Sequence, residues 1–231
     1  MMPETKVLLW DFDGTLGYRP GMWRQALFDV LRENDPASPI TEEDLRPLLR
    51  NGFPWHQPDI VHTHITTAEQ WWTEIEAVLA RAFIGVGIHS FQAARLAQLA
   101  HHKYIQQQSW YLFEDVLPTL SKLASEGWRH VILSNHVPEL PSIVEGLGLV
   151  ALIDTVISSA LTGYEKPHPQ AFINVLEQLH YPETVWMIGD NIEADILGAA
   201  AVNIPGILVR KEDKRANYTS LDLYGVSTFL P

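Results

Sequence analysis

Residues 6–16 read Lys6-Val7-Leu8-Leu9-Trp10-Asp11-Phe12-Asp13-Gly14-Thr15-Leu16. A run of apolar residues that includes the β-branched Val7 predicts a buried strand, and Gly14 ends the pattern. The strand therefore ends at Asp11 and Asp13, whose spacing puts both side chains on one side of an extended backbone. Burial of two acids is unfavourable unless a cation lies close to them. The competing interpretation is an ordinary turn, because Asp and Gly are common in turns.

The composition of the 231-residue chain is typical of a globular protein, with 46% hydrophobic and 19% charged residues. The formal net charge of −12 argues against nucleic acid or an acidic membrane as a partner, since both attract positive surfaces. The absence of cysteine excludes disulfides, thiolate catalysis and thiolate-bound zinc. Met1 to Pro3 lead directly into the predicted strand, which leaves no room for a signal peptide, and no apolar run approaches the length of a membrane span. We therefore expect a cytoplasmic protein.

Residues 17–111 show helical patterns and no strand patterns. Apolar residues at helical spacing predict helices over about 22–31, 71–83 and 90–107, and Thr41 followed by three acids predicts the start of another. His62 and His64 could bind a metal with His56 nearby, but without a third ligand of known geometry we interpret them as solvent-facing loop residues. Arg19 and Arg24 precede or begin the first helix, where a substrate could lie, although nothing in the pattern requires it.

Strand and helix patterns alternate from Val116 onward. Short apolar strands are expected at 130–133, 154–158, 185–188 and 206–209, and the segments between them show helical patterns. This alternation predicts a parallel sheet with helices on both faces, which binds its ligands at the carboxyl ends of the strands. Residues 211–231 contain a run of charges and are expected to form a solvated loop.

Polar side chains follow three of the predicted strands. Asp11 and Asp13, Ser134 and Asp190 stand at strand ends, and Lys166 precedes a helix on the same side of the sheet. Three carboxylates at one place suit Mg²⁺, which prefers hard oxygen ligands. A hydroxyl and an ammonium group beside a metal suit a phosphate group. One carboxylate could then attack phosphorus as a nucleophile, and a second could protonate the leaving oxygen.

The order of these motifs resembles the haloacid dehalogenase-like hydrolase superfamily. Residues 11–15 (Asp-Phe-Asp-Gly-Thr) resemble its first motif, Ser134 at the end of a hydrophobic strand the second, and Lys166-Pro167 the third. Residues 189–195, in which Gly-Asp is followed by a further Asp, resemble the fourth. The resemblance implies a Rossmann-like α/β core formed by residues 1–16 and 112–231. It further implies that residues 17–111 are an all-helical cap inserted between the first and second motifs.

The resemblance implies a role for each matching residue. Asp11 would be the nucleophile and a Mg²⁺ ligand, and Asp13 the general acid and base, with its backbone carbonyl on the metal. Asp190 would complete the metal site, and Asp195 would support the metal's water or Lys166. The transferring phosphoryl group would be held by the remaining residues of the motifs: Ser134, Lys166, and amides around Gly14 and Asn135. His136 follows this turn and is a candidate for the pocket wall.

Asp13 also separates the activities found in this superfamily. The dehalogenases that the sequence resembles carry another residue at this position and need no metal, because a halide leaves without a proton. An alkoxide needs a proton, so Asp13 favours phosphate esters over a metal-independent dehalogenase. A phosphomutase of the same fold and a catalytically silent binding module are the two competing hypotheses that the sequence leaves open. We expect a small phosphorylated metabolite as the partner and a monomer or homodimer, and the substrate itself depends on cap side chains whose positions the sequence does not reveal.

Overall fold

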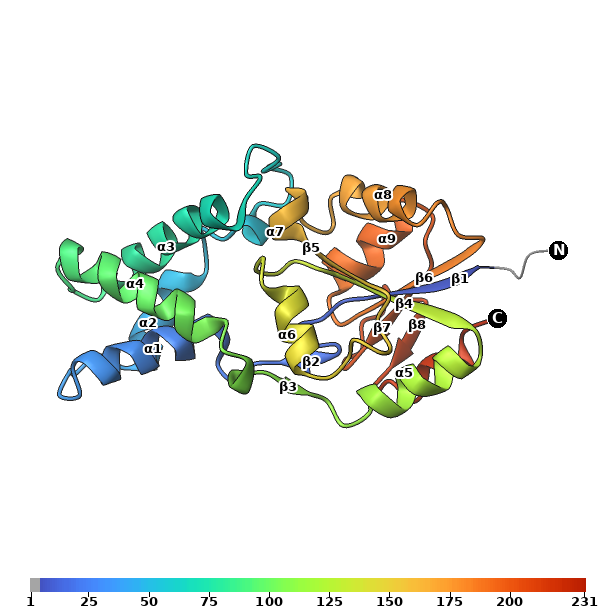
Figure 1. Ribbon diagram of the computed structural model, residues 1–231, viewed down its shortest axis with the longest axis horizontal. Coiled ribbons are helices and arrows are strands. Elements are labelled where there is room, and N and C mark those ends of the chain that lie inside the picture. Colours follow the sequence, from blue (N-terminus) through green and yellow to red (C-terminus); the bar gives the residue numbers. More distant parts are fainter. Residues whose placement is uncertain (1–4) are drawn as a thin grey trace.

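The computed structural model describes residues 5–231, so the expectation for Met1 to Pro3 lies outside the described residues. Figure 1 shows a sheet with helices on both of its faces and, beside it, a separate group of helices. The sheet has six strands in the order β5-β4-β1-β6-β7-β8, and every neighbouring pair is parallel. Within residues 5–231, no helix has the length and apolar character needed to cross a membrane.

Strand β1 (Lys6–Trp10) lies at the centre of the sheet, between β4 (Trp128–Ser134) and β6 (Thr184–Gly189). Trp10 is in register with Ile132 on one side and with Ile188 on the other. The three strands therefore run out at the same edge of the sheet. Side chains that follow them in the sequence are brought together by the backbone ladder, however far apart they stand along the chain.

Alternate residues of β1 enter two different cores. Leu8 and Trp10 belong to a core that also includes residues of α5 (Val116–Ser125) and α6 (Leu140–Gly146). Val7 and Leu9 belong to the core beneath α8 (Pro169–Gln178) and α9 (Gly198–Ala200). Both faces of the strand are buried, which is why its sequence is continuously apolar. The predicted α/β fold with helices on both faces is confirmed.

The remaining elements of this side complete the sheet and its connections. They are β5 (Thr155–Ser158), α7 (Ser159–Thr162), β7 (Gly206–Val209) and β8 (Tyr218–Ser220). Between β6 and α9 the chain forms a π-helical segment, Ile192–Leu197, where the sequence pattern predicts an ordinary helix over 192–202.

The separate group of helices contains α1 (Met22–Asn34), α2 (Glu42–Leu45), α3 (Ala68–Gly85) and α4 (Ser90–Tyr104). We call residues 17–111 the helical block. Large apolar side chains such as Trp71, Leu79 and Phe83 are buried within it, and they belong to the same hydrophobic cluster as Leu8 and Trp10 of β1.

The expectation that residues 17–111 contain no strand is wrong at both ends. β2 (Gly17–Tyr18) pairs antiparallel with β3 (Tyr111–Leu112), where the chain enters and leaves the helical block. Two segments that cross the same boundary in opposite directions lie side by side, and pairing satisfies their backbone groups. Two residues on each side are too short to produce a recognisable alternation of side chains.

The expectation of a solvated loop over residues 211–231 is also wrong. β8 extends the sheet, and Leu223 and Val226 are fully buried. The Leu223 amide donates to Asp115 Oδ2 (2.8 Å), and Arg210 donates to both oxygens of the same carboxylate at 2.7 Å. The charged residues from Lys211 to Arg215 come just before this segment, and for this reason the sequence pattern alone predicts a solvated loop.

Candidate active site

Three of the predicted site residues meet at the end of β1. The Ser134 hydroxyl donates to Asp11 Oδ1 at 2.8 Å, and the Lys166 ammonium donates to the same oxygen at 2.9 Å. Both donors are almost completely buried, whereas the Asp11 side chain is 11% exposed. Asp11 Oδ2 has no hydrogen-bond partner among the described residues. One oxygen of the carboxylate is thus held in place while the other is available.

Lys166 lies between two carboxylates. Its ammonium donates to Asp195 Oδ1 at 2.5 Å as well as to Asp11. Burial alone would lower the pKa of Lys166, but the two adjacent carboxylates outweigh burial and raise it above its ordinary value. Lys166 is therefore a permanent cation at the centre of this site.

The Asn135 side chain fixes the loop that carries Lys166. Its amide nitrogen donates to the Lys166 carbonyl (2.8 Å), and its amide oxygen accepts from the Lys166 backbone N–H (2.7 Å). This two-point clamp joins the end of β4 to a loop that lies 31 residues later in the sequence. The role of this side chain is structural, and only the Asn135 backbone amide is left to contact a ligand.

Asp195 is aimed at Lys166 by the turn that precedes it. The Asn191 side chain caps the π-helical segment by accepting from the N–H groups of Glu193 and Ala194, and Asp195 Oδ2 accepts from the Asn191 N–H at 2.9 Å. A Cβ at Gly189 would stand 2.1 Å from Asp195 Oδ2, so only glycine fits there. Gly189 is thus required by the approach of this carboxylate.

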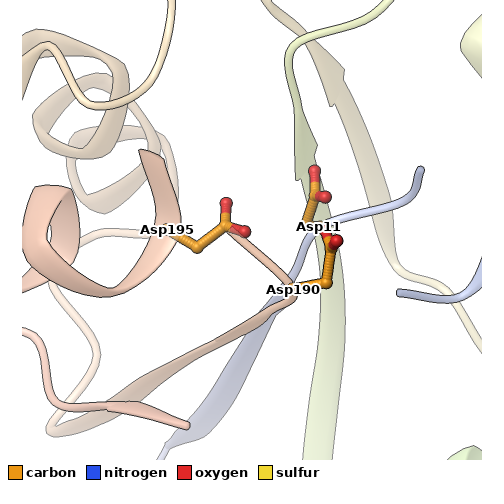
Figure 2. A group of neighbouring side chains, drawn as sticks. All are labelled: Asp11, Asp190 and Asp195. Carbon is orange, nitrogen blue, oxygen red and sulfur yellow. The ribbon is translucent and has the colours of Figure 1, made fainter. Parts of the chain in front are cut away.

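Carboxylates of Asp11, Asp190 and Asp195 form a cluster in which one oxygen of each lies within 4.8 Å of the others. Figure 2 shows the Asp11 and Asp190 side chains next to each other at the strand ends, with Asp195 approaching from the π-helical segment. Both Asp195 oxygens are already hydrogen-bonded, to Lys166 and to Asn191. Asp190 receives one hydrogen bond, from Lys211 to Oδ2 at 3.1 Å. Free oxygens therefore remain on Asp11 and Asp190.

This donor set fits a divalent cation. Asp11, Asp13, Asp190 and Asp195 place four carboxyl groups around one buried ammonium, and the exposed Lys211 is the second cation in contact with them. Like charges that are partly removed from water repel strongly unless a counter-charge is present. Hard carboxylate oxygens in such a cluster match Mg²⁺ better than softer metals. The Asp13 carboxylate is not a member of the three-residue cluster.

Gly14 adopts a conformation that suits glycine, with φ of 78°, and a Cβ there would lie 2.9 Å from Asp190 Oδ2. Its N–H donates to the Gly17 carbonyl at 2.9 Å. The tight turn thus uses the N–H of Gly14 itself, and the expectation that amides around Gly14 help to hold a phosphoryl group stays a prediction. The contribution of Gly14 is to let the strand end approach Asp190.

Asp13 and His136 face each other at the edge of the site. Burial, followed by the charges of Asp11 and Asp190, raises the pKa of Asp13 well above its ordinary value, so this carboxyl group holds a proton more readily than a free aspartate. His136 Nε2 lies 3.6 Å from Asp13 Oδ2, and burial lowers the pKa of His136 to about 4. A raised pKa of Asp13 suits the role of a general acid beside a nucleophilic carboxylate.

A cavity of about 420 Å³ opens above these groups. Its floor contains the predicted site residues except Gly14. Its opposite wall comes from the helical block, and it consists of side chains that the sequence pattern does not assign to a site: Met22, Trp23, Trp55, Pro58 and Tyr104. Trp23 and Tyr104 are recognisable in the sequence only as apolar positions of helices, because packing and pocket lining produce the same pattern.

Other candidates lie outside the cavity. Arg19 is buried, donates to the Met22 carbonyl at 2.8 Å and packs against the Tyr104 ring. Arg24 pairs with Glu42 on the surface of the helical block.

His62 and His64 lie in a loop of the helical block. His62 is partly buried, which differs from the solvent-facing position expected for it, and His64 is exposed. Within residues 5–231, neither belongs to a group of three potential metal ligands.

Comparison with known proteins agrees with this fold and arrangement. The family model described as haloacid dehalogenase-like hydrolase matches residues 5–203. The chain belongs to the haloacid dehalogenase-like hydrolases, and the family predicted from the four motifs is confirmed.

Individual relatives show how far this similarity extends. Haloacid dehalogenase-like hydrolase domain-containing protein 3 of Homo sapiens is 30% identical over 154 residues, which cover 66% of this chain and 60% of the length of that protein. Glyceraldehyde 3-phosphate phosphatase of Methanothermobacter thermautotrophicus is 25% identical over 232 residues, which cover 96% of this chain and 92% of that enzyme. The crystal structure of 2-haloacid dehalogenase from Pseudomonas syringae superimposes with a TM-score of 0.68 at 22% identity, covering 97% of each chain. The last likeness shows the shared fold.

Proposed function

We propose that this chain is a Mg²⁺-dependent hydrolase of small phosphomonoesters that acts through an aspartyl-phosphate on Asp11. The observation that carries the proposal is the arrangement of the Asp11 carboxylate. Ser134 and Lys166 hold Oδ1, and Oδ2 is free and faces a cavity. A fixed carboxylate with one free oxygen, beside a permanent cation, suits attack on a phosphoryl group.

The phosphoryl group would be held by residues that are already in place. Lys166 supplies a buried positive charge, Ser134 a hydroxyl, and Asn135 a backbone amide at the end of β4. Asp11, Asp190 and the backbone carbonyl of Asp13 would hold the metal. When bound, Mg²⁺ supplies charge neutralisation for the phosphoryl oxygens.

The two half-reactions balance through Asp13. In the first, Asp11 Oδ2 forms a bond to phosphorus, the ester P–O bond breaks, and the proton of Asp13 passes to the leaving oxygen. In the second, the ionised Asp13 takes a proton from water as the water oxygen attacks phosphorus. The bond from phosphorus to Asp11 breaks, inorganic phosphate leaves, and Asp13 is protonated again. The raised pKa of Asp13 favours its starting protonated form.

Asp13 also supports ester hydrolysis over dehalogenation. Removal of a halide needs no acid, so a dehalogenase would gain nothing from a protonated carboxyl group at this position. The Methanothermobacter relative, whose alignment spans almost the whole of both chains, is named as a phosphatase. A silent binding module would have no need for the unfavourable burial of Asp11, Lys166 and Asp195 together.

We further propose that residues 1–16 and 112–231 form the catalytic core and residues 17–111 a cap. The helical block supplies one wall of the cavity, and the chain enters and leaves the block through the paired strands β2 and β3. A backbone hydrogen bond from the His62 N–H to the Gly163 carbonyl (2.8 Å) also joins the block to the core. A lid on such a narrow connection would exclude water during phosphoryl transfer.

The test is a screen of small phosphorylated metabolites with Mg²⁺, with an aryl phosphate as a general control. Release of inorganic phosphate that stops with a chelator and returns with added Mg²⁺ is the expected result. A metal-independent rate would contradict the proposal. An isomerised sugar phosphate in place of inorganic phosphate would show a phosphomutase instead.

A further inference from the structure

The cavity has two chemically different walls. The core wall contributes carboxylates, the Ser134 hydroxyl and the Lys166 ammonium, together with a few smaller apolar residues: Val137, Pro167 and Ala194. The wall from the helical block consists of the apolar and aromatic side chains Met22, Trp23, Trp55, Pro58 and Tyr104. Since the phosphate must contact the core wall, the organic part of a substrate must contact the helical block.

The aromatic rings on this wall are fixed by stacking. The Trp23 and Tyr104 rings stack with centroids 3.6 Å apart and planes within 3°, and Trp55 stacks on Phe53 at 4.8 Å and 13°. Trp55 remains partly exposed although one of its faces is covered by Phe53. Preorganised rings present apolar surface to a ligand without loss of side-chain freedom on binding.

A second anionic group would find no counter-charge here. Lys166 is the one lysine or arginine that lines the cavity within residues 5–231, and its ammonium is already shared by Asp11 and Asp195. Arg19 is not among the lining residues, and its guanidinium is engaged by the Met22 carbonyl and the Tyr104 ring behind that wall. Glu193 adds another carboxylate to the lining.

We infer that the substrate carries the phosphate as its one anionic group, on an apolar, ring-bearing alcohol that contacts Trp55 and Met22. This inference rests on the proposed phosphatase function. A carboxylate or second phosphate on the organic part would be desolvated against aromatic rings without a cation, which is unfavourable.

The test compares benzyl phosphate, glycerol 3-phosphate and phosphoglycolate, which are all esters of primary alcohols. We expect kcat/KM for benzyl phosphate to exceed the other two by about tenfold or more, mainly through KM. A phosphoglycolate value equal to or above that of benzyl phosphate would overturn the inference and leave the proposed function intact. Failure to hydrolyse all three with Mg²⁺ would overturn both.

Two substitutions of Trp55 sharpen this test. Trp55→Ala should lower kcat/KM for benzyl phosphate by about tenfold and leave glycerol 3-phosphate within about twofold. Trp55→Arg should shift the preference toward phosphoglycolate by supplying the absent cation. Phe91→Ala removes an aromatic ring that is 84% exposed on α4. This variant should leave the kcat/KM of benzyl phosphate unchanged relative to glycerol 3-phosphate and to phosphoglycolate. Unchanged ratios in both Trp55 variants would overturn the assignment of this wall.

His136 is a buried imidazole with few polar neighbours. The residue is 2% exposed, neither ring nitrogen makes a hydrogen bond of normal geometry, and the Val137 backbone lies close enough to interact with the ring. Its ring is enclosed by Phe12, Trp110 and Tyr104. Buried polar atoms are rarely left poorly paired, so such an imidazole next to a reactive group points to a function.

Asp13 is the group that His136 faces. Nε2 lies 3.6 Å from Asp13 Oδ2, just beyond hydrogen-bond distance, and Asp13 Oδ1 is itself buried without a partner. The geometry points to His136 as a positioning residue that holds the Asp13 carboxyl group for proton transfer to the leaving oxygen. A small shift on substrate binding would close the hydrogen bond.

The dependence of kcat on the leaving group distinguishes a positioning role of His136 from a merely structural one. p-Nitrophenolate leaves without a proton, whereas the alkoxide of benzyl phosphate needs one. His136→Phe, which keeps a ring in the aromatic enclosure, should lower kcat for benzyl phosphate by about tenfold or more and leave p-nitrophenyl phosphate within about threefold.

Conservative variants complete the test. A glutamine amide nitrogen reaches the position of Nε2, so His136→Gln should recover most of the benzyl phosphate rate. An asparagine amide nitrogen reaches the position of Nδ1 instead, so His136→Asn should not. Equal losses with both substrates in His136→Phe, or no loss, would overturn the positioning role.

Discussion

The two walls of the cavity differ in what places their side chains. On the core wall, Asp11, Ser134 and Asp190 follow three strands whose register is set by backbone hydrogen bonds. On the helical wall, Trp23, Trp55 and the other side chains are placed by packing within the helical block. A strand end is defined to within one residue, because a shift would move every side chain of a buried strand to the opposite face. Under the proposed function, the chemistry would take place on the rigid wall, and the wall that packing alone defines would contact the organic group.

Charge is distributed in the same unequal way. The Asp11–Lys166–Asp195 group is almost completely removed from water, whereas Arg24 and Glu42 of the helical block pair near the surface. Removal of one charge from a buried group leaves the remaining charges unpaired and away from water, which is strongly destabilising. Surface pairs contribute little. Substitutions of buried charges on the core wall should therefore lower activity and stability more than substitutions of exposed charges on the helical block.

The largest effect is expected for Asp11→Asn. The amide cannot attack phosphorus, so kcat should fall by about 10⁴-fold or more, while the fold is retained because one oxygen can still accept from Ser134. Steady-state kinetics and circular dichroism measure the two properties. Asp154→Asn, on the exposed surface of the core, is the matched control and should keep full activity. Normal turnover in Asp11→Asn would remove the nucleophile assignment.

Lys166→Met should affect both stability and rate. The substitution leaves Asp11 and Asp195 buried without a cation, which is expected to lower the free energy of unfolding by about 3–5 kcal/mol. Urea denaturation measures this loss. Lys122→Met removes an ammonium group from a side chain that is 57% exposed and should leave the free energy of unfolding nearly unchanged. Similar values for the two variants would contradict the contrast between buried and exposed charge.

Glu165→Gln should change how stability depends on pH. Burial raises the pKa of Glu165 from its ordinary value of 4.5 to about 7. The folded state therefore keeps a proton that the unfolded state has lost, so the contribution of Glu165 is most favourable below about pH 4.5 and is lost as the pH rises through about 7. The glutamine amide of the variant does not titrate, so its contribution to stability does not change over this pH range. The free energy of unfolding of the variant should exceed that of the native chain by about 3 kcal/mol above about pH 7 and approach it near about pH 5.

Urea denaturation at several pH values measures that difference. Glu145→Gln, at an exposed position of α6, provides the matched control and should leave the pH profile unchanged. A constant difference between Glu165→Gln and the native chain across about pH 5–8 would show that Glu165 is ionised in the folded protein.

The smallest effect is expected at the contact between the helical block and the core. The Trp72 indole N–H donates to Glu139 Oε1 at 2.9 Å, across the boundary between them. Trp72→Phe removes that donor and should lower the free energy of unfolding by about 1 kcal/mol. Thermal or urea denaturation detects it. If Trp72→Phe lowered the free energy of unfolding as much as Lys166→Met, this contact would contribute far more to stability than a single neutral hydrogen bond.

Sequence reasoning succeeds where a local pattern and a tertiary requirement coincide. β1 is buried on both faces, so its apolar run is recognisable, and Gly14 and Asp190 stand where backbone geometry leaves little choice of residue. It fails where a contact spans the chain. β8 escapes recognition because its partner β7 and the buried Leu223 lie on either side of a charge run.

The class of fold, the family and the acids at the strand ends can be predicted from the residues alone. These depend on short-range patterns: apolar strands, helical periodicity and motifs in a fixed order. Three contacts are visible only in the folded chain: Lys166 lies between Asp11 and Asp195, His136 faces Asp13, and aromatic rings from the helical block line the site. Such contacts join residues that stand far apart in the sequence, and the packing of the whole chain sets them.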